Sequence, residues 1–265
     1  MKILKFTLKG KTGFFKKPDV NTYLYFTYGN IHKVALLGMF GAILGLSGYN
    51  SMKLKELLIS KNKKNKTENE IEYPEFYEKL KDLKISIIPN AKHGFISKKV
   101  QNCNNSVGYA SKEQGGNLIV KEQWLENPSW DIYLVIENEI SEKLSNYILN
   151  NKAVYQPYLG KNDHYADIMN VKILEGNEVT DVENVDKINC LFKKEDFNII
   201  FADEEDEEEE EVSEDLFKYE ERLPIALNRN TNMYESCSFI FTNMNIDCKA
   251  NCDIYNVDNK NIVFY

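Results

Sequence analysis

The longest apolar stretch of the chain covers residues 34–46 and is interrupted only by Gly38, Gly41 and Gly45. A helix of this length rises about 20 Å, whereas the hydrocarbon core of a bilayer is roughly 30 Å thick. The stretch therefore predicts a buried helix and not a membrane span. Glycine costs about 1 kcal/mol relative to alanine inside a helix. Three glycines along one flank predict that another backbone approaches the helix closely there.

The polar residues before this helix predict its start and its chemistry. Asn30 is the expected N-cap, because a short amide side chain can accept from the free N–H groups of the first turn. His32 and Lys33 would then lie at the positive end of the helix dipole. Free N–H groups beside basic side chains favour an anion such as phosphate.

Alternating and periodic apolar positions predict the other elements of residues 1–174. The expected elements are a strand at residues 2–8, a short helix at 75–83, a strand at 84–88, two paired strands at 118–124 and 130–136, a helix capped by Ser141, and a strand at 165–174. Together with the helix at 34–46, this order favours an α+β protein with a ferredoxin-like N-terminal domain over residues 1–174, the topology of RNA-recognition domains.

Two polar segments interrupt this domain. Residues 90–117 contain Lys92, His93, Lys98 and Lys99 together with several glycines, which predicts a long, exposed β-hairpin arm with a basic face. Residues 60–70 have no apolar side chain, so we expect an exposed and mobile insertion there.

The remaining residues, 175–265, predict a β-rich C-terminal region. Short strand-like runs occur at residues 188–192, 197–202, 234–244 and 262–265. A run at residues 203–215 with 11 acidic side chains interrupts them. Because self-repelling charges rarely pack, we interpret this run as a solvated loop in preference to a docking element.

The charge of the chain is distributed unevenly. The formal net charge is −8, yet residues 1–66 contain 13 lysines against two acidic residues, a local charge of +11. The total therefore does not exclude RNA as a partner. A hydrophobic content of 43% predicts a folded protein. No signal peptide is visible, so we expect a cytoplasmic protein without membrane contact.

The five cysteines allow two interpretations. Their odd number predicts reduced thiols and not a disulfide framework. Cys248 and Cys252 have the spacing of metal ligands, with Cys237 upstream, but a second pair of this type is missing. Partly buried thiols are therefore preferred over a zinc site, and we expect neither a metal nor a cofactor.

The loop at residues 10–18, GKTGFFKKP, combines lysines with two aromatic rings. In one interpretation the lysines hold RNA phosphates while a ring stacks on an unpaired base. In the other, Phe14 and Phe15 anchor the loop to the core and the lysines are only solvated. The sequence favours the two interpretations about equally, and we expect Phe14 and Phe15 to divide the two roles between them.

Three segments resemble a known family. Residues 2–49, KILKFTLKGKTGFFKKPDVNTYLYFTYGNIHKVALLGMFGAILGLSGY, resemble the opening of the Cas-five family, the RAMP-type subunits of type I CRISPR Cascade complexes, most of all those of subtype I-B. That opening likewise has a strand, a loop of the kind FFKKPD and a helix of the kind GAILGL. Residues 155–161, YQPYLGK, and 219–227, YEERLPIAL, resemble its later PYLGK-type and LPIAL-type segments.

The resemblance implies a ferredoxin-like fold of the RAMP type and a non-catalytic, RNA-binding function. Cas-five subunits hold the repeat-derived 5′ handle of the guide RNA and contact the large subunit and the Cas-seven backbone subunit, near the handle-proximal end of the target DNA. Their hairpin "thumb" would correspond to residues 90–117. Because base pairing by the guide reads the target, such a subunit needs only to recognise RNA shape, backbone and a few unpaired bases.

The predicted RNA contacts combine cations for phosphates with rings for bases. We expect phosphate contacts from Lys16, Lys17, Lys33, Lys98 and Lys99, with Lys161 as a weaker candidate, base stacking from Phe15 and Tyr28, and a hydrogen bond to a phosphate or a 2′-hydroxyl from His32. For each residue alone, an ordinary surface lysine or core aromatic is an equally good interpretation. The prediction depends on the cluster.

An enzyme is the alternative. Relatives in subtype I-C cleave the precursor repeat RNA without metal, using a tyrosine, a lysine and a histidine. Such cleavage needs a base, an acid and a cation beside the phosphorane. The nearest equivalents here are Tyr49, Lys92 and His93. A free-standing binder of single-stranded RNA is a third interpretation, which the net acidity makes less favourable.

Overall fold

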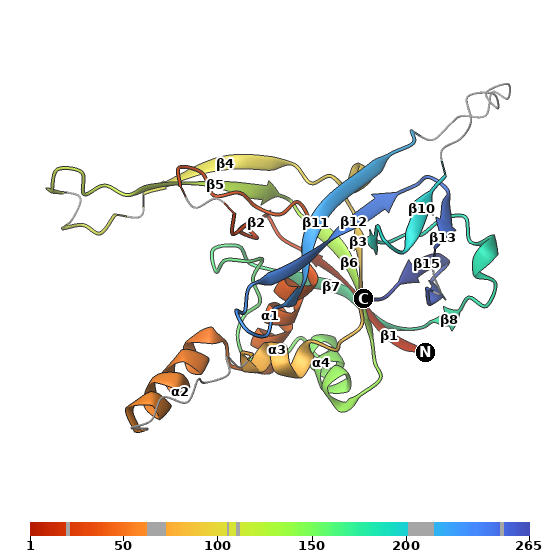
Figure 1. Ribbon diagram of the computed structural model, residues 1–265, viewed down its shortest axis with the longest axis horizontal. Coiled ribbons are helices and arrows are strands. Elements are labelled where there is room, and N and C mark those ends of the chain that lie inside the picture. The colour runs from red at the N-terminus through yellow and green to blue at the C-terminus, as the bar shows by residue number, and fades with distance from the viewer. Residues whose placement is uncertain (20–21, 63–72, 105, 110–111, 201–214, 250–251) are drawn as a thin grey trace.

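The computed structural model describes residues 1–19, 22–62, 73–104, 106–109, 112–200, 215–249 and 252–265. Several antiparallel sheets and a smaller number of helices surround two hydrophobic cores (Figure 1). The expected mixture of helices with strand-rich sheets is thus confirmed. Most of the predicted insertion at residues 60–70 and of the acidic run at 203–215 lies outside the described residues.

A four-stranded antiparallel sheet forms the centre of the molecule. Its strands are β1 (Lys2–Lys9), β3 (Ile85–Pro89), β6 (Ser129–Val135) and β7 (Asp167–Glu175), in the order β3-β6-β1-β7. The two-residue period of β1 places Leu4, Phe6 and Leu8 on one fully buried face. All four strands were expected from the sequence.

Four helices accompany this sheet, namely α1 (Lys33–Leu44), α2 (Tyr49–Asn62), α3 (Glu75–Leu80) and α4 (Glu139–Leu149). α1 is the expected glycine-rich helix, and its Phe40 ring meets Phe6 of β1 edge to face at 6.3 Å between centroids. α1 is therefore a core helix. In the described part of the chain, no helix has both the length and the apolar character that crossing a membrane requires.

The glycines of α1 have different roles. A Cβ at Gly41 would lie 2.5 Å from Cβ of Phe76 in α3, so the predicted close approach is confirmed there. At Gly38 the nearest neighbour would be 3.9 Å away, an ordinary contact. Gly45 lies outside the helix as its left-handed C-cap, with φ at 75°. A Cβ at Gly45 would lie 2.9 Å from Val154 Cγ1, so the predicted close approach is confirmed at Gly41 and Gly45 and was wrong only at Gly38.

Both predicted helix caps were wrong, for local reasons. Asn30 is fully buried, and its amide accepts from Trp130 Nε1 at 2.8 Å and donates to the Gly94 carbonyl at 3.2 Å, so His32 caps α1 instead. Asn138 caps α4 in a capping box, where Ser141 is the third helical residue and accepts from the Asn138 N–H at 3.0 Å.

The predicted pairing of residues 118–124 with 130–136 was also wrong. The first of these two segments lies in β5 (Ile119–Glu126), which pairs with β4 (Lys98–Asn104) and with β2 (Thr12–Gly13). β6 is buried along most of its length and has β1 and β3 as neighbours, whereas β5 is largely half-exposed. The chain changes sheets at the turn between them, where Asn127 has φ at 47°.

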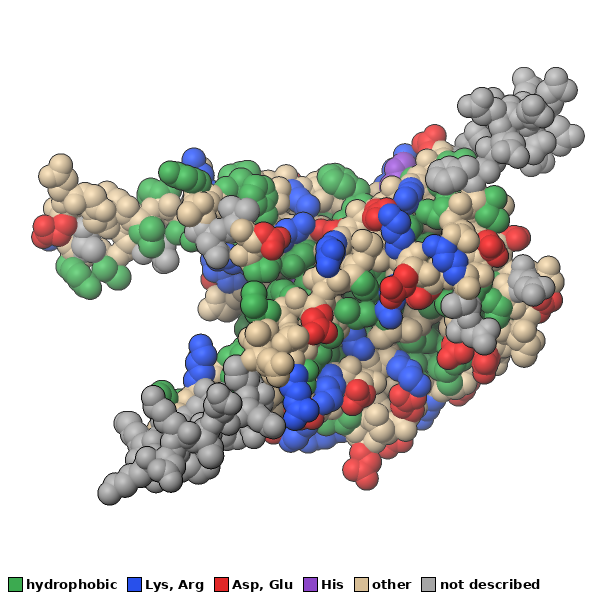
Figure 2. All heavy atoms as spheres, viewed as in Figure 1, with side chains coloured by type: hydrophobic (Ala, Val, Ile, Leu, Met, Phe, Trp, Pro, Cys, Tyr) green, Lys and Arg blue, Asp and Glu red, His purple; other side chains and the backbone are tan. Residues whose placement is uncertain are grey.

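The hairpin of β4 and β5 extends from the body, and α2 extends from the same side of the molecule (Figure 1). The predicted arm at residues 90–117 thus contains one strand of the observed hairpin, and the second strand follows it. A 3-10 turn, η1 (Lys92–Gly94), precedes the hairpin. The projecting hairpin is also visible in the space-filling view (Figure 2).

The C-terminal region consists of short strands in three further sheets. The elements are β8 (Asn177–Glu178), η3 (Val182–Asn184), β9 (Phe192–Lys193), β10 (Phe197–Ile199), β11 (Lys218–Leu227), β12 (Tyr234–Thr242), β13 (Ile246–Cys248), β14 (Ile254–Val257) and β15 (Lys260–Val263). The sheets have the orders β11-β12-β9, β10-β13 and β15-β14-β8. The predicted β-rich character is confirmed, although the long strand β11 was not expected.

β11 is linked to the start of α1 through one carboxylate. Glu221 accepts from the backbone N–H groups of Gly29, at 2.8 Å, and Asn30, at 3.2 Å, and from the Tyr219 hydroxyl at 2.7 Å. A Cβ at Gly29 would overlap that hydroxyl, so a larger residue would force the Tyr219 side chain to move away from Glu221. Through this contact the C-terminal region fixes the loop that precedes α1.

Candidate nucleic-acid interface

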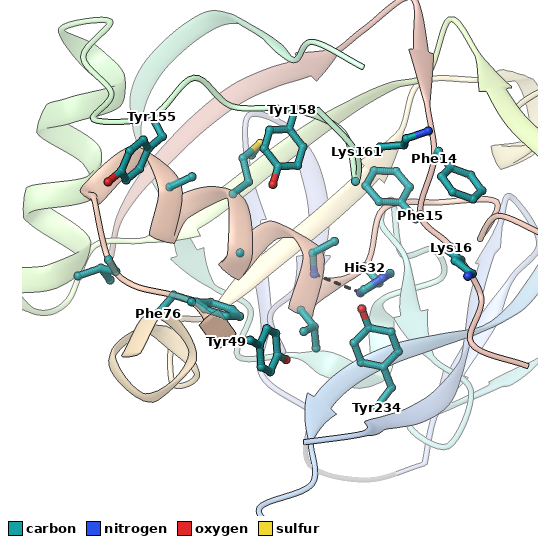
Figure 3. A pocket seen from close by; sticks show the side chains of 18 residues that line it. Phe14, Phe15, Lys16, His32, Tyr49, Phe76, Tyr155, Tyr158, Lys161 and Tyr234 are labelled. Carbon is teal, nitrogen blue, oxygen red and sulfur yellow. Dashed lines mark hydrogen bonds between the residues drawn. The ribbon is translucent and has the colours of Figure 1, made fainter. Parts of the chain in front are cut away.

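A cavity of about 780 Å³ lies along α1 and is lined by residues from distant parts of the chain (Figure 3). Rings, cations and small residues of α1 share the lining, which comprises Phe14, Phe15, Lys16, His32, Val34, Ala35, Gly38, Met39, Ala42, Leu46, Gly48, Tyr49, Phe76, Tyr155, Tyr158, Gly160, Lys161 and Tyr234. Because Gly38 has no side chain, the surface of α1 is recessed at this position. The cavity has the size and character of a site for a flat aromatic ligand with a negative charge.

His32 lies at the N-terminus of α1 and is only 3% exposed. Its Nδ1 accepts from the Ala35 N–H at 3.2 Å, which leaves the ring proton of the neutral form on Nε2. Burial lowers the pKa of His32 to about 3, so the ring is neutral at physiological pH. The predicted donor role is compatible with this tautomer, since Nε2–H can donate, but the ring carries no positive charge.

Lys16 and Lys161 are the cations that line the cavity. Lys16 is exposed and lies 3.9 Å above the centre of the Tyr25 ring. Lys161 binds Glu122 and Asp163, each at 3.2 Å. Although partial desolvation lowers the pKa of Lys161, these two carboxylates raise it overall. The structure thus brings both predicted residues to one site, with Lys161 also neutralising the buried Glu122.

The two rings predicted to stack on bases are buried. Phe15 is 4% exposed and packs edge to face on Trp130, and Phe14 is 5% exposed. Tyr28 is 5% exposed, and burial raises its pKa to about 12. Burial of Phe14 and Phe15 fits the interpretation in which both anchor the loop to the core. Little of Phe15 or Tyr28 is available for a base, which argues against the stacking roles given to them.

The remaining predicted cations are spread over neighbouring surfaces. Lys17 lies 3.4 Å from Glu221. Desolvation lowers the pKa of Lys33 to about 8 at the first position of α1, and Lys33 does not line the cavity although its neighbours His32 and Val34 do. On β4, Lys98 is half-buried and desolvation lowers its pKa, whereas Lys99 lies 3.7 Å from Glu126. Consecutive strand residues face opposite ways, so these two lysines do not form one basic face.

The three residues of the enzymatic alternative do not form one site. Tyr49 lines the cavity beside Tyr234, at the start of β12. His93 stacks on Phe217 at 4.8 Å and adjoins Gly94, which contacts Phe241 near the other end of β12. Tyr234 and Phe241 are seven positions apart on the strand, which corresponds to about 23 Å. In addition, burial raises the pKa of Tyr49 to about 12, which disfavours it as a base.

Lys92, the third of these residues, is 79% exposed and lies 3.8 Å from Asp215. Its neighbour His93 contacts Phe217, two residues further along. The turn at η1 therefore contacts the last residue of the acidic run, Asp215, and the chain that follows it. This contact was not expected from the sequence.

Sequence reasoning missed three tyrosines of the cavity. Tyr155, Tyr158 and Tyr234 have exposed fractions of 61%, 44% and 40%, so their rings are available to a ligand in a way that Phe15 and Tyr28 are not. Tyr155 and Tyr158 belong to the YQPYLGK segment, whose resemblance to a family segment could have indicated them. Nothing in the local sequence of Tyr234 indicates its position at the cavity.

The outer face of the central sheet lacks a stacking platform. Lys5 pairs with Asp131 at 2.8 Å, and Thr7 donates to the same carboxylate at 2.7 Å. Tyr133, on the same face, is fully buried by the second core. Base stacking on the sheet, as in RNA-recognition domains, is therefore not available on these strands.

Metal binding has no support among the described residues, which contain no group of three or more potential ligands. Cys237, Cys248 and Cys252 are in the reduced thiol form. Burial raises the pKa of Cys252 to about 12, which disfavours the thiolate that a metal requires.

No family model matches the sequence, and no curated protein matches it. Among solved structures, the chain is similar to one of a CRISPR RNA-guided surveillance complex, with 11% identity over 93% of this chain and 91% of that chain, at a TM-score of 0.48. It is also similar to a CRISPR protein from Archaeoglobus fulgidus, with 11% identity over 100% and 99% of the two chains, at a TM-score of 0.46. At these identities and scores, the family of the chain does not follow.

Proposed function

We propose that this protein is a non-catalytic RNA-binding subunit of a type I CRISPR Cascade complex, similar to the Cas-five subunits of subtype I-B. In this proposal it holds the 5′ handle of the guide RNA. It contacts the Cas-seven backbone subunit and the large subunit, near the handle-proximal end of the target DNA.

One observation carries the proposal. The segments that resemble the Cas-five family are far apart in the sequence, yet residues from FFKK, from the glycine-rich helix and from YQPYLGK line the same cavity. The YEERLPIAL segment forms most of β11, whose Glu221 fixes the loop before that helix. A resemblance that covers one site is a better indication of shared function than one that covers only core positions.

The chemistry of the cavity suits a single RNA strand. The exposed tyrosine rings offer faces on which unpaired bases stack, and Lys16 offers a charge for the backbone phosphate. The neutral His32 can donate from Nε2 to a 2′-hydroxyl, a group that DNA lacks. Recognition of this kind needs shape and a few bases, because the guide itself reads the target.

The fold supports the same proposal. Numbered along the chain, the central strands have the order 2-3-1-4, with α1 after the first and α4 after the third, and this order supports the ferredoxin-like domain that we propose. The projecting β4–β5 hairpin would act as the thumb. We include no cleavage in the proposal, because Tyr49 lies apart from Lys92 and His93.

The test is to express the protein with its genomic neighbours, purify it through a tag on this chain, and sequence the 5′ ends of the RNA that co-purifies. We expect small RNAs with one common, repeat-derived 5′ end. Lys16→Glu should lower the amount of RNA retained by about tenfold, because a phosphate contact becomes repulsive. Lys161 is less suitable for this test, since its loss also leaves Glu122 unpaired.

Lys187→Glu is the matched control, because Lys187 is an exposed lysine that does not line the cavity. It should retain RNA as the wild type does. Intact partner proteins without an RNA of common 5′ end would contradict the proposal. Equal loss in both variants would show that only the total charge matters.

A further inference from the structure

A second depression, of about 570 Å³, adjoins the cavity, because Tyr49 and Tyr234 line both. Its charged lining residues are Lys17, Asp19 and Arg222, and Tyr28 also lines it. A strand of RNA that leaves the cavity past these two tyrosines would therefore enter the second depression directly. A further depression, of about 390 Å³, continues from it and shares Arg222 and Ser236.

Arg222 is therefore the charged residue that lines both the second and the third depression. It lies exposed on β11, directly opposite Ser238 of β12, and Tyr234 and Ser236 occupy the same face of that strand by register. Lys194, Lys249 and Glu195 line the third depression, the one of about 390 Å³. The path thus runs from the cavity along the outer face of β11 and β12.

Of the two cations that line the second depression, Lys17 and Arg222, only Arg222 has no ion-pair partner in the part of the chain that the structure describes and can bind an anionic ligand. Lys17 lies within 3.4 Å of Glu221, which compensates its charge. Glu221 and Arg222 are neighbours on a strand, so the carboxylate points toward Gly29 while the guanidinium points outward. Among the described residues, no side chain makes an ion pair with Arg222.

The chemical nature of this residue is unusual for the chain. The sequence has 33 basic residues, of which only Arg222 and Arg229 are arginines. A guanidinium presents a planar fork of donors that matches two phosphate oxygens, and it is more weakly hydrated than the ammonium group of lysine. An arginine without an ion pair, between two hollows and beside an exposed tyrosine, is suited to a phosphodiester.

We propose that Arg222 binds a backbone phosphate of the RNA strand where it leaves the cavity, so that the RNA path continues over β11 and β12. The inference rests on the proposed function and adds to it the direction in which the RNA strand leaves the cavity. The strand passes between Tyr49 and Tyr234 toward Arg222. The ligand class is single-stranded RNA, and recognition at this point is independent of the bases.

Phenylglyoxal, which modifies guanidinium groups, tests this directly because the chain has only two arginines. The purified Cascade particle, with its guide RNA, is treated before and after digestion of the RNA with ribonuclease, and each arginine is quantified by peptide mass spectrometry. We expect RNA to protect Arg222 by at least about fivefold, whereas Arg229 is the internal reference. A lysine-directed reagent on the same samples reports whether Lys16 is protected.

The two proposals fail in different ways in this experiment. Protection of Lys16 without protection of Arg222 overturns the path over β11 and leaves the proposed function in place. Protection of neither residue contradicts both. Equal protection of Arg222 and Arg229 would show a covering partner protein and also overturn the assignment.

Variants give a second measurement on the purified chain with a synthetic single-stranded RNA of the repeat-derived 5′ end. Arg222→Ala should weaken binding by about tenfold and reduce the slope of log affinity against log salt by about 0.7, the value for one phosphate contact on a single strand. Arg222→Lys should keep the slope, because the charge remains, but not the full affinity. Arg229→Ala should change neither quantity. An unchanged slope in Arg222→Ala would overturn the inference.

Discussion

His32 shows how one side chain can satisfy the fold and remain suitable for a ligand. Its Nδ1 replaces an N-cap acceptor for α1, and the rings of Phe15, Tyr28 and Tyr234 surround the imidazole at centroid distances of 6.2, 5.1 and 5.4 Å. A charged imidazolium could not accept at Nδ1 and would be poorly solvated in this position. The residue is therefore held neutral by its surroundings.

This burial predicts a specific pH dependence of stability. The pKa of His32 falls to about 3 in the folded state, against about 6.5 when unfolded. The unfolded chain therefore binds more protons between these values, and the free energy of unfolding falls as the pH falls. Between about pH 7.5 and about pH 5.5 the contribution of His32 is about 1.4 kcal/mol. His32→Asn keeps a capping acceptor and should lose this part of the pH dependence.

The measurement is urea denaturation of both proteins at the two pH values. His164, whose pKa is also lowered by burial, contributes equally in both and cancels. The same pH dependence in wild type and His32→Asn would show that His32 titrates normally in the folded protein.

At the residue scale, the sequence singled out two segments that line the cavity but not which of their side chains are exposed. FFKK was indicated by its lysines and rings, and YQPYLGK by its resemblance to a family segment. Phe15 and Tyr28, however, are core residues, and the accessible rings are Tyr155, Tyr158 and Tyr234. Exposure of a ring depends on what packs against it from distant segments, and a local pattern of charges and rings contains no such information.

At the scale of elements, α1 and α3 make the closest helix contact. Gly41 faces Cβ of Phe76 at a distance that excludes a side chain, whereas Gly38 on the same helix has room for a methyl group. The two positions thus form a matched pair, in which helix propensity is the same and only the packing differs.

We predict opposite effects of alanine at these two positions. Gly41→Ala should destabilise the protein by about 1–3 kcal/mol, because the new Cβ forces α3 away from α1. Gly38→Ala should stabilise it by up to about 1 kcal/mol, the difference in helix propensity. Chemical denaturation of both variants beside the wild type measures this. Equal changes in the same direction would contradict the packing explanation.

The element that sequence reasoning placed incorrectly was β5. Its apolar alternation was recognised, but its partner was not, because β6 follows it directly and a short turn favours a hairpin. The pairing is decided instead by burial. β6 fits between two strands of the central sheet, and β5, with Lys121, Glu122 and Gln123, suits a half-exposed sheet. A local signal cannot weigh two possible partners against each other.

At the scale of the whole molecule, opposite charges occupy different parts of the chain. The 11 acidic side chains at residues 203–215 and the local charge of +11 in residues 1–66 are comparable in size. Such an acidic run lowers the attraction of the whole molecule for other polyanions, and salt screens this effect.

We predict that neutralising the acidic run raises non-specific nucleic-acid binding. In a variant with Ser or Gln in place of these acidic residues, affinity for random duplex DNA should rise about tenfold or more at about 50 mM salt, and much less at about 300 mM. Fluorescence anisotropy at both salt concentrations measures the effect. A gain that is independent of salt would indicate loss of a specific contact and not of repulsion.

The assembly of the cavity from residues as distant as Phe14 and Tyr234 has a consequence for when the protein can act. The N-terminal lysines leave the ribosome early, but the cavity cannot exist until β12 has been made and has docked. Under the proposed function, a nascent chain would therefore attract RNA only through charge, and specific retention would begin after the cavity has formed. Guide RNA bound in this way would select completed subunits, so that the ligand acts as a check on synthesis before the protein enters a larger particle.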